Sequence, residues 1–214
     1  MLDTQKYSAI IWDWNGTIVD DSRLAFDIYC EECELYGLEK MTFEEYKGRF
    51  YFPVKKFYEE VGLPPEKYGT VADRFSIIYR EKWHEIKVHR QVEKYLRLFT
   101  EAGVRQFILS AYRQSELRDM VKYYGLENYF CEIAGVEDNL AHSKVERGRK
   151  LLDNCGIIPQ KALMIGDTEH DFEVAKALGI DIVLISWGTI SHEKLTAKGG
   201  GNMVFQDLKG AFGE

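Results

Sequence analysis

The stretch SAIIWDWNGT, at residues 8–17, joins a short apolar segment to a polar turn. Residues 8–12 are too few for a stable helix and include β-branched and aromatic side chains, so we predict a buried strand that ends at Asp13. Similar apolar segments predict further strands at residues 104–110, 130–135, 162–166 and 181–186. Amphipathic patterns between them predict helices at residues 91–103, 115–125, 144–156 and 173–179. This alternation is typical of a parallel sheet with helices on both faces, so we predict an α/β fold with a Rossmann-like, doubly wound core.

One long segment interrupts the alternation after the first strand. Two stretches with helical patterns, at residues 22–62 and 70–86, are separated by the loop GLPPEKYG, whose prolines exclude a helix interior. Aromatic side chains recur through the first stretch, as in the core of a helical bundle. We therefore predict an all-helical cap at residues 19–87, inserted into a core made of residues 1–18 and 88–214. The tail of the chain is expected to hold a glycine-rich loop and one edge strand.

Composition limits the classes of partner. The chain has 214 residues and a net charge of −7, with 45% hydrophobic and 29% charged residues, as in ordinary globular proteins. It contains no run of Lys and Arg, so we expect no nucleic-acid partner, and its acidic balance disfavours anionic membranes. The first apolar stretch is too short for a signal peptide, and none approaches the ~18 apolar residues of a membrane span. We therefore expect a cytoplasmic protein, as a monomer or a homodimer.

Candidate site residues fall where predicted strands end. They are Asp13 and Thr17 after the first strand, Ser110 and Ala111 after the second, Asp167 and Asp171 after the segment ALMI, and Lys144 at the start of a helix. The carboxyl ends of the strands form the ligand crevice of a doubly wound sheet, so these residues are expected to meet there. Taken singly, each has an ordinary alternative: Ser110 could cap the following helix, and Lys144 could be a solvated helix lysine.

The residue types point to phosphate chemistry with a metal ion. Carboxylates that converge on one crevice repel one another unless a cation lies between them, and oxygen ligands together with a phosphate favour Mg²⁺. A carboxylate beside that ion can attack phosphorus and form an aspartyl-phosphate. Lys144 would supply positive charge to the phosphoryl oxygens, and the hydroxyls of Ser110 and Thr17 would supply hydrogen bonds.

These motifs, in this order, resemble the haloacid-dehalogenase-like superfamily, especially its phosphoglycolate-phosphatase and β-phosphoglucomutase-like members. The family pattern is DxDGT, a Ser or Thr that ends the second strand, a Lys, and GDxxxD. Here it reads as Asp13 to Thr17, Ser110, Lys144, and Gly166-Asp167 with Asp171. The resemblance covers nearly the whole chain, and the helical insertion lies where that subgroup carries its cap.

The resemblance implies a role for each residue. Asp13 would be the nucleophile and a Mg²⁺ ligand, and the backbone carbonyl of Asn15 would be another ligand. Asp167 would bind the ion directly, and Asp171 would bind it or hold a metal-bound water. Ser110, with Ala111 beside it, and Lys144 would bind the phosphoryl group of a small phosphorylated metabolite. Arg49 lies in the loop KGRFYFPVKK, where related caps carry residues that select the substrate; a solvated charge cluster is the equal alternative.

Asn15 departs from the family pattern. Family phosphatases have an Asp at this position, which protonates the leaving oxygen and then activates water. An amide cannot exchange a proton near neutral pH, and general acid–base help is worth roughly 10²–10⁴-fold. Three explanations stay open: a leaving group that needs little protonation, a deliberately inactivated variant, or a phosphate-binding relative without turnover. His170 is a candidate substitute base, although an ordinary surface residue on the loop of the GDxxxD motif is the favoured interpretation.

We therefore predict a Mg²⁺-dependent phosphatase that hydrolyses a small phosphomonoester through an aspartyl-phosphate on Asp13. A sugar-phosphate mutase is the alternative enzyme, although it too needs an acid–base group. A non-catalytic protein that binds a phosphorylated metabolite is the alternative from another class. Dehalogenation is disfavoured, because the GDxxxD motif implies a metal that such chemistry does not need.

Overall fold

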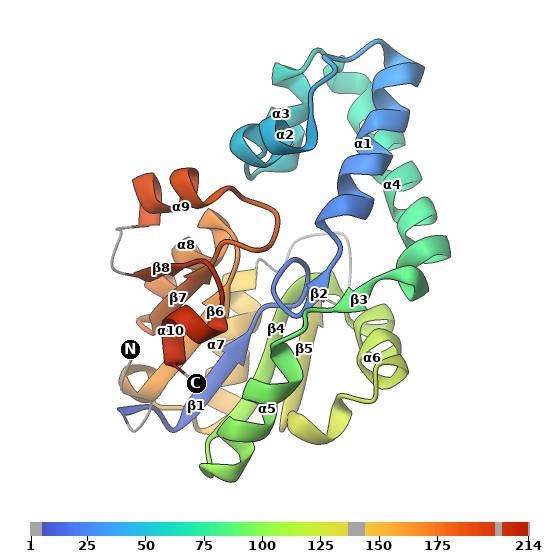
Figure 1. Cartoon of the computed structure of the whole chain (residues 1–214). Helices are drawn as coiled ribbons and strands as arrows, with labels where there is room; N and C mark the ends of the chain where they lie inside the picture. The colour runs from blue at the N-terminus through green and yellow to red at the C-terminus, as the bar shows by residue number, and fades with distance from the viewer. Residues whose placement is uncertain (1–5, 137–143, 200–202, 214) are drawn as a thin grey trace.

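The computed structural model describes residues 6–136, 144–199 and 203–213. Its main sheet has six strands in the order β5-β4-β1-β6-β7-β8, and each pairing between neighbours is parallel. The strands are β1 (Ala9–Trp12), β4 (Arg105–Arg113), β5 (Glu132–Val136), β6 (Ala162–Gly166), β7 (Asp181–Ile185) and β8 (Val204–Phe205). The predicted doubly wound α/β core is confirmed, with β1 and β6 adjacent at the centre of the sheet (Figure 1).

Helices cover both faces of this sheet (Figure 1). They are α5 (Val92–Glu101), α6 (Gln114–Tyr123), α7 (Lys144–Cys155), α8 (Glu169–Leu178), α9 (His192–Gly199) and α10 (Leu208–Phe212). Successive β1 side chains point to opposite faces, so Ile11 packs into one apolar core and Ile10 and Trp12 into the other. Short 3-10 helices lie at Pro65–Lys67, Trp83–Glu85, Glu127–Tyr129 and Pro159–Lys161.

The segment between β1 and β4 carries four helices that stand above the carboxyl ends of the core strands (Figure 1). They are α1 (Ser22–Tyr36), α2 (Phe43–Arg49), α3 (Val54–Glu60) and α4 (Tyr68–Lys82). Strands β2 (Val19–Asp20) and β3 (Lys87–Val88) pair antiparallel where the chain leaves and re-enters the core. We call α1 to α4 the cap. Tyr29, Tyr46 and Phe57 pack against one another at its centre, with ring centroids 5.3–5.7 Å apart.

Some predicted boundaries are wrong. The continuous helix expected over residues 22–62 is divided into three, because Gly37 ends α1 in a left-handed conformation and the Thr42 side chain caps a new helix. The strand expected at residues 104–110 continues to Arg113 through a shift of register with β5. Helix α8 begins before the predicted residue 173, and α9 and α10 were not predicted. Among the described residues, no helix is both long and apolar enough to cross a membrane.

Candidate active site

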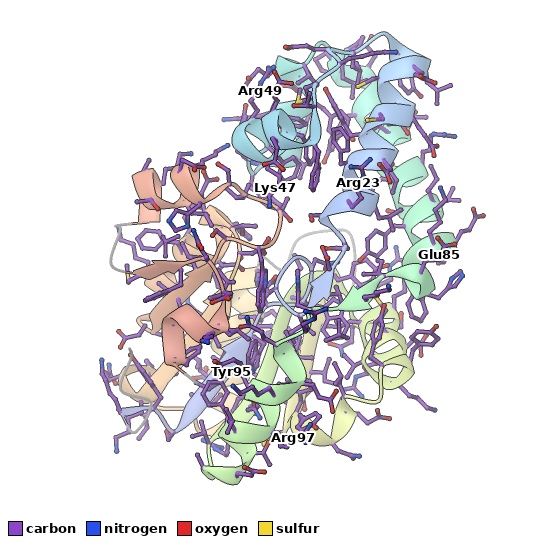
Figure 2. The ribbon with its side chains drawn as sticks, viewed as in Figure 1. Arg23, Lys47, Arg49, Glu85, Tyr95 and Arg97 are labelled. Carbon is purple, nitrogen blue, oxygen red and sulfur yellow. The ribbon has the colours of Figure 1, made fainter. Side chains whose placement is uncertain are left out.

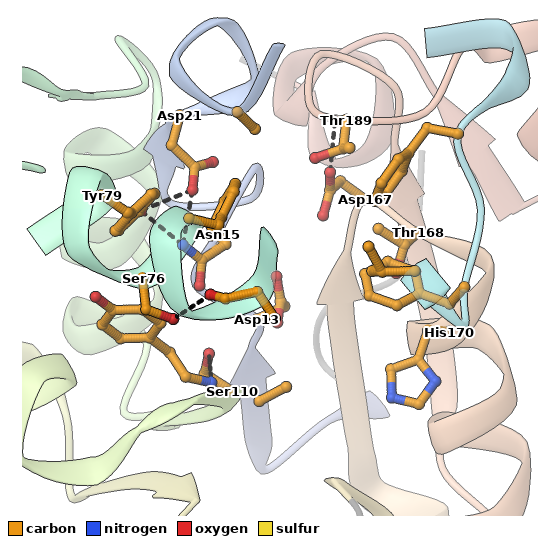
Figure 3. Close-up of a pocket in the computed structure, with 18 of the residues that line it drawn as sticks. Asp13, Asn15, Asp21, Ser76, Tyr79, Ser110, Asp167, Thr168, His170 and Thr189 are labelled. Atoms are coloured by element: carbon orange, nitrogen blue, oxygen red, sulfur yellow. Dashed lines mark hydrogen bonds between the residues drawn. The ribbon is translucent and has the colours of Figure 1, made fainter. Parts of the chain in front are cut away.

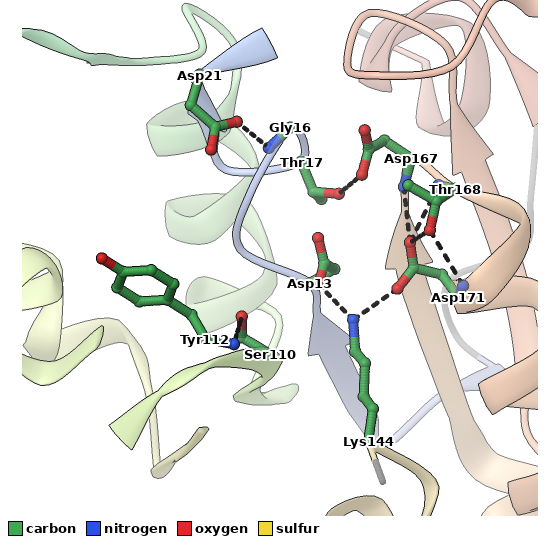
Figure 4. Close-up of polar contacts among 10 residues, drawn as sticks. All are labelled: Asp13, Gly16, Thr17, Asp21, Ser110, Tyr112, Lys144, Asp167, Thr168 and Asp171. Atoms are coloured by element: carbon green, nitrogen blue, oxygen red, sulfur yellow. Dashed lines mark hydrogen bonds and ion pairs between the residues drawn. The ribbon is translucent and has the colours of Figure 1, made fainter. Parts of the chain in front are cut away.

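Three carboxylates and one lysine meet at the carboxyl ends of β1 and β6. Asp13 follows β1, Asp167 follows β6, Asp171 lies in the first turn of α8, and Lys144 is the first residue of α7. Each carboxylate has an oxygen within 4.8 Å of the other two, and all four side chains are buried. The Lys144 ammonium donates to Asp13 Oδ1 and, at 2.6 Å, to Asp171 Oδ1 (Figure 4). The structure therefore brings together the four charged residues that the sequence singled out.

Asp171 is fully engaged by protein donors. Its Oδ2 accepts hydrogen bonds from the hydroxyl (2.6 Å) and the backbone N–H (3.0 Å) of Thr168 and lies 3.3 Å from the backbone nitrogen of Asp167. Thr168 in turn caps α8, which places Asp171 at the positive end of that helix. Burial alone raises the pKa of Asp171, but Lys144 and Thr168 more than offset this, so the pKa lies below its usual value. Asp171 is thus held as an anion.

Asp13 and Asp167 lack that compensation. Burial raises the pKa of Asp13 to about 7, although Lys144 opposes the rise. Burial and the charges of Asp13 and Asp171 raise the pKa of Asp167 well above its usual value. Asp167 accepts hydrogen bonds only from Thr17 Oγ1 (3.2 Å) and the backbone N–H of Thr189 (2.7 Å) among the described residues. One lysine cannot neutralise three buried carboxylates, so this donor set fits a divalent cation that binds oxygen.

The backbone around Asp167 leaves space that only glycine allows. A Cβ at Gly16 or at Gly188 would lie 2.2 Å from Asp167 Oδ2. Gly16 also has a φ of 72°, which disfavours any residue with a side chain. The two loops can therefore approach the carboxylate closely and enclose it.

The candidate phosphate-binding residues differ in placement. Ser110 and Ala111 line the cavity above Asp13, and Ser110 Oγ accepts a hydrogen bond from the backbone N–H of Tyr112 at 3.0 Å. Within the described parts of the chain no acceptor engages its hydroxyl hydrogen, which can therefore donate to a phosphoryl oxygen. Thr17 is buried with its hydroxyl on Asp167 and does not line the cavity. Thr17 thus holds a carboxylate in place instead of facing substrate directly.

Asn15 belongs to a polar network that includes two residues the sequence reasoning missed. Its amide nitrogen donates to Asp21 Oδ2 (2.7 Å) and to the Tyr79 hydroxyl (2.8 Å), which itself donates to Asp21 Oδ2 (2.7 Å). The backbone N–H of Gly16 donates to the other Asp21 oxygen at 2.7 Å. Since the nitrogen is held on the Asp21 side, the amide oxygen faces the side of Asp13 (Figure 3). Two consecutive aspartates, Asp20 and Asp21, lie just beyond the motif that follows the first strand, and they were a local signal for Asp21. Nothing in the sequence marked Tyr79.

A cavity of about 360 Å³ lies between the acidic cluster and the cap. Its core side is polar, and its cap side is mainly aromatic, with Asp21 and Ser76 as polar members (Figure 3). The core side comprises Asp13, Asn15, Ser110, Ala111, Lys144, Asp167, Thr168, His170, Asp171 and Thr189. The rest is lined mainly by Tyr46, Phe50, Phe52, Val54, Tyr58, Tyr68, Val71, Phe75 and Tyr79 from the cap, with Tyr112 from β4. Lys144 is the only Lys or Arg that lines it in the described parts of the chain.

The structure does not bring Arg49 into this cavity, so its predicted contact with substrate finds no support. The Arg49 guanidinium pairs with Glu39 at 2.6 and 3.0 Å and lies 3.4 Å from Glu60, on the side of α2 away from the core (Figure 2). What faces the core is the backbone: Lys194 donates to the carbonyls of Arg49 (2.9 Å) and Phe50 (2.6 Å). These two hydrogen bonds tie the end of α2 to α9.

His170 lines the cavity and stacks on Phe52 of the cap, with ring centroids 5.5 Å apart. Burial, helped by the charge of Lys144, lowers its pKa below 6.5. The imidazole is therefore neutral near pH 7 and adds no positive charge to the cavity.

Comparisons with known proteins show the family and the fold of this chain. The family model described as haloacid dehalogenase-like hydrolase matches residues 10–185. A protein named putative pyrophosphatase PpaX, from Caldanaerobacter subterraneus subsp. tengcongensis, is 25% identical over 199 residues, which cover 89% of this chain and 86% of that protein. The tyrosine-protein kinase PtkA of Mycobacterium tuberculosis is 34% identical over 185 residues, which cover 84% of this chain but only 62% of the kinase. A haloacid dehalogenase-like hydrolase from Streptococcus pneumoniae superposes with a TM-score of 0.80 at 20% identity, over 95% of each chain.

Proposed function

This chain belongs to the haloacid dehalogenase-like hydrolase family, as a member related to its phosphatases, and we propose that it hydrolyses a small phosphomonoester with Mg²⁺ through an aspartyl-phosphate on Asp13. One observation carries the proposal. Asp13, Asp167, Asp171 and Lys144 form a single buried cluster that opens onto a cavity of small-molecule size.

Each residue has a role in this scheme. Asp13 attacks phosphorus, and the P–O bond to the leaving group breaks; water then attacks the aspartyl-phosphate, releasing orthophosphate and restoring the carboxylate. Asp13, Asp167 and the backbone carbonyl of Asn15 would hold Mg²⁺, which would offset the negative charge of the phosphate. Asp171, with both oxygens already engaged, orients Lys144 toward Asp13. Ser110 and Lys144 stabilise the phosphoryl oxygens.

The helices of residues 19–87 act as a lid in this proposal. They cover the cavity from the side opposite Asp13, and α2 is tied to α9 through Lys194. A lid of this kind excludes water from the site while the phosphoryl group is transferred.

Asn15 supports one alternative, a protein that binds a phosphorylated metabolite without turning it over. The Asn15 amide is fixed by Asp21 and Tyr79 and cannot carry a proton between leaving group and water. In the enzyme proposal this limits the choice of leaving group. In the alternative it abolishes the reaction.

A panel of phosphomonoesters, assayed with Mg²⁺ and with a chelator, separates the two. We expect orthophosphate release by the wild-type chain that requires Mg²⁺ and is lost in Asp13→Ala. Calorimetry should show Mg²⁺ binding to the wild-type chain that is weakened in Asp167→Ala, independently of activity. Binding of phosphomonoesters without turnover of any of them, or of the acyl phosphate acetyl phosphate, would favour the binding protein. Absence of Mg²⁺ binding at millimolar concentration would refute the metal site.

A further inference from the structure

We propose that the cap side of the cavity selects phosphate esters of phenols, that is, aryl phosphates whose ring carries no second anionic group. This inference rests on the proposed phosphatase function and specifies the substrate class of the same site. Three independent features support it: the aromatic lining, the distribution of charge, and the chemistry of Asn15.

The aromatic lining provides a surface for a flat ring. Tyr46, Phe50, Tyr58, Tyr68, Phe75 and Tyr79 all border the cavity. Phe75 and Tyr79, one turn apart on α4, stack with centroids 5.8 Å apart and an interplanar angle of 20°. Aromatic faces bind other aromatic rings through stacking or edge contacts, beyond the gain from burying apolar surface. A phosphate held at Asp13 would direct its leaving group toward these rings.

The distribution of charge disfavours a second anion. Among the residues that the structure describes, Lys144 is the only Lys or Arg that lines the cavity, and its ammonium already donates to two carboxylates. Arg49 pairs with Glu39, and Arg74 pairs at 2.8 Å with both Glu31 and Glu32. A carboxylate or second phosphate on the cap side would therefore lose its hydration without gaining a cation. The uncharged tyrosine hydroxyls still tolerate a neutral polar substituent.

Asn15 restricts the leaving group in the same direction. No carboxyl stands at position 15 to protonate the ester oxygen, so the departing group must be stable as an anion. A phenol, with a pKa of about 10, leaves far more readily than an aliphatic alcohol. When Asp13 attacks phosphorus, the P–O(aryl) bond breaks, its electron pair stays on the phenolate oxygen, and the phenolate takes its proton from water.

The test uses matched pairs of substrates on the full chain with Mg²⁺. Phenyl phosphate and benzyl phosphate both carry a ring but differ in leaving group, and we expect kcat/KM to favour phenyl phosphate by roughly 10²-fold or more. For 4-methylphenyl against 4-carboxyphenyl phosphate, similar in size, we expect roughly a tenfold or larger preference for the methyl compound, although its phenol leaves less readily. A nucleoside 5′-monophosphate, with an aromatic base on an aliphatic ester, should be slower than phenyl phosphate.

A gain-of-charge variant tests the electrostatic argument directly. Ala72 lines the cavity from α4, so Ala72→Lys brings a cation to the cap side, and Ala72→Met is a control of similar length without charge. We expect Ala72→Lys, but not Ala72→Met, to reduce the preference for the methyl over the carboxyl compound by roughly tenfold. Far-ultraviolet circular dichroism should first establish that both variants fold. An unchanged ratio in folded Ala72→Lys would contradict the charge argument.

Acetyl phosphate separates failure of this inference from failure of the proposed function, because it has no ring and a good leaving group. If the chain hydrolyses acetyl phosphate but prefers benzyl phosphate, a nucleotide or the carboxylated ester, the inference is wrong and the phosphatase function stands. If it hydrolyses none of these compounds, the proposed function fails first. A peptide with phosphotyrosine distinguishes the source of the aryl group: turnover near that of phenyl phosphate supports the proposal with a protein source, and much slower turnover supports it with a small-molecule source.

Discussion

Asn15→Asp introduces a carboxylate at the centre of the site, where we expect it to share a proton with the neighbouring Asp21. The new carboxyl would lie where the Asn15 amide nitrogen now contacts Asp21, at a separation of 2.7 Å. Two full charges at that distance repel by about 6 kcal/mol at an effective dielectric constant of ~20, equivalent to a pKa rise of more than four units. The carboxyls at positions 15 and 21 should therefore share one proton at neutral pH.

This shared proton should affect the rates of the two half-reactions differently. A protonated carboxyl can donate to a leaving oxygen, so Asn15→Asp should speed the first half-reaction with aliphatic esters by roughly 10²–10⁴-fold. It cannot accept a proton from water, so breakdown of the aspartyl-phosphate should gain little. Adding Asp21→Asn restores a donor opposite the carboxylate, and this double variant should speed breakdown by roughly 10²–10⁴-fold.

Rapid mixing with an aryl phosphate measures both steps, since phenol release reports the first and orthophosphate release the second. The wild-type chain should show a phenol burst near one equivalent, followed by a slow phase. Thermal unfolding provides a second readout: Asn15→Asp should lose about 1–3 kcal/mol through the mismatched pair, and the double variant should recover most of it. Full acceleration of the slow phase by Asn15→Asp alone, without loss of stability, would refute the coupling between residues 15 and 21. Because Asn15-Gly16 is prone to deamidation, mass spectrometry must establish that the wild-type chain is intact.

Three further predictions concern stability and the cap. Because burial raises the pKa of Asp13 to about 7, the folded chain binds more protons than the unfolded chain between about pH 4 and pH 7. Without metal, the free energy of unfolding should therefore decrease as the pH rises through that window, by up to about 4 kcal/mol. Urea unfolding in a chelator at pH 5 and pH 8 should show this fall. Asp13→Asn should reduce the fall without abolishing it, because burial also raises the pKa of Asp167; an equal slope in both chains would exclude Asp13 as a source. Lys194→Met removes two hydrogen bonds to the end of α2, worth about 1–2 kcal/mol. This variant should raise KM for phenyl phosphate by roughly 5–30-fold and leave KM for acetyl phosphate little changed. An equal rise in KM for both compounds would contradict a role of Lys194 in cap closure. Arg49→Ala breaks ion pairs that are partly exposed, so the free energy of unfolding in denaturant should fall by less than about 1 kcal/mol and substrate preference should not change. A rise in KM for some substrates and not others would indicate that Arg49 contacts substrate.

The sequence alone determined the core of the fold and most of the acidic site. Strands in a parallel sheet are short apolar runs, and their carboxyl ends share one edge, so local patterns sufficed to place Asp13 and Asp167 together. The capping of α8 is equally local, because Thr168 and Asp171 are three residues apart and satisfy each other's backbone groups. Ser110 lies at the predicted edge of the sheet, where the carboxyl ends of the strands meet, although β4 continues past it.

Only the tertiary structure decided what the cap presents to the site. Aromatic spacing in the cap indicated a helical core, but which rings face the cavity depends on how four helices pack and where they rest on the sheet. Tyr79 reaches Asn15 across 64 positions of the chain, and the Arg49 side chain turns to Glu39 while its carbonyl meets Lys194. Such contacts depend on distant residues meeting in space, which periodicity cannot encode because it reports only neighbours within one helix or strand.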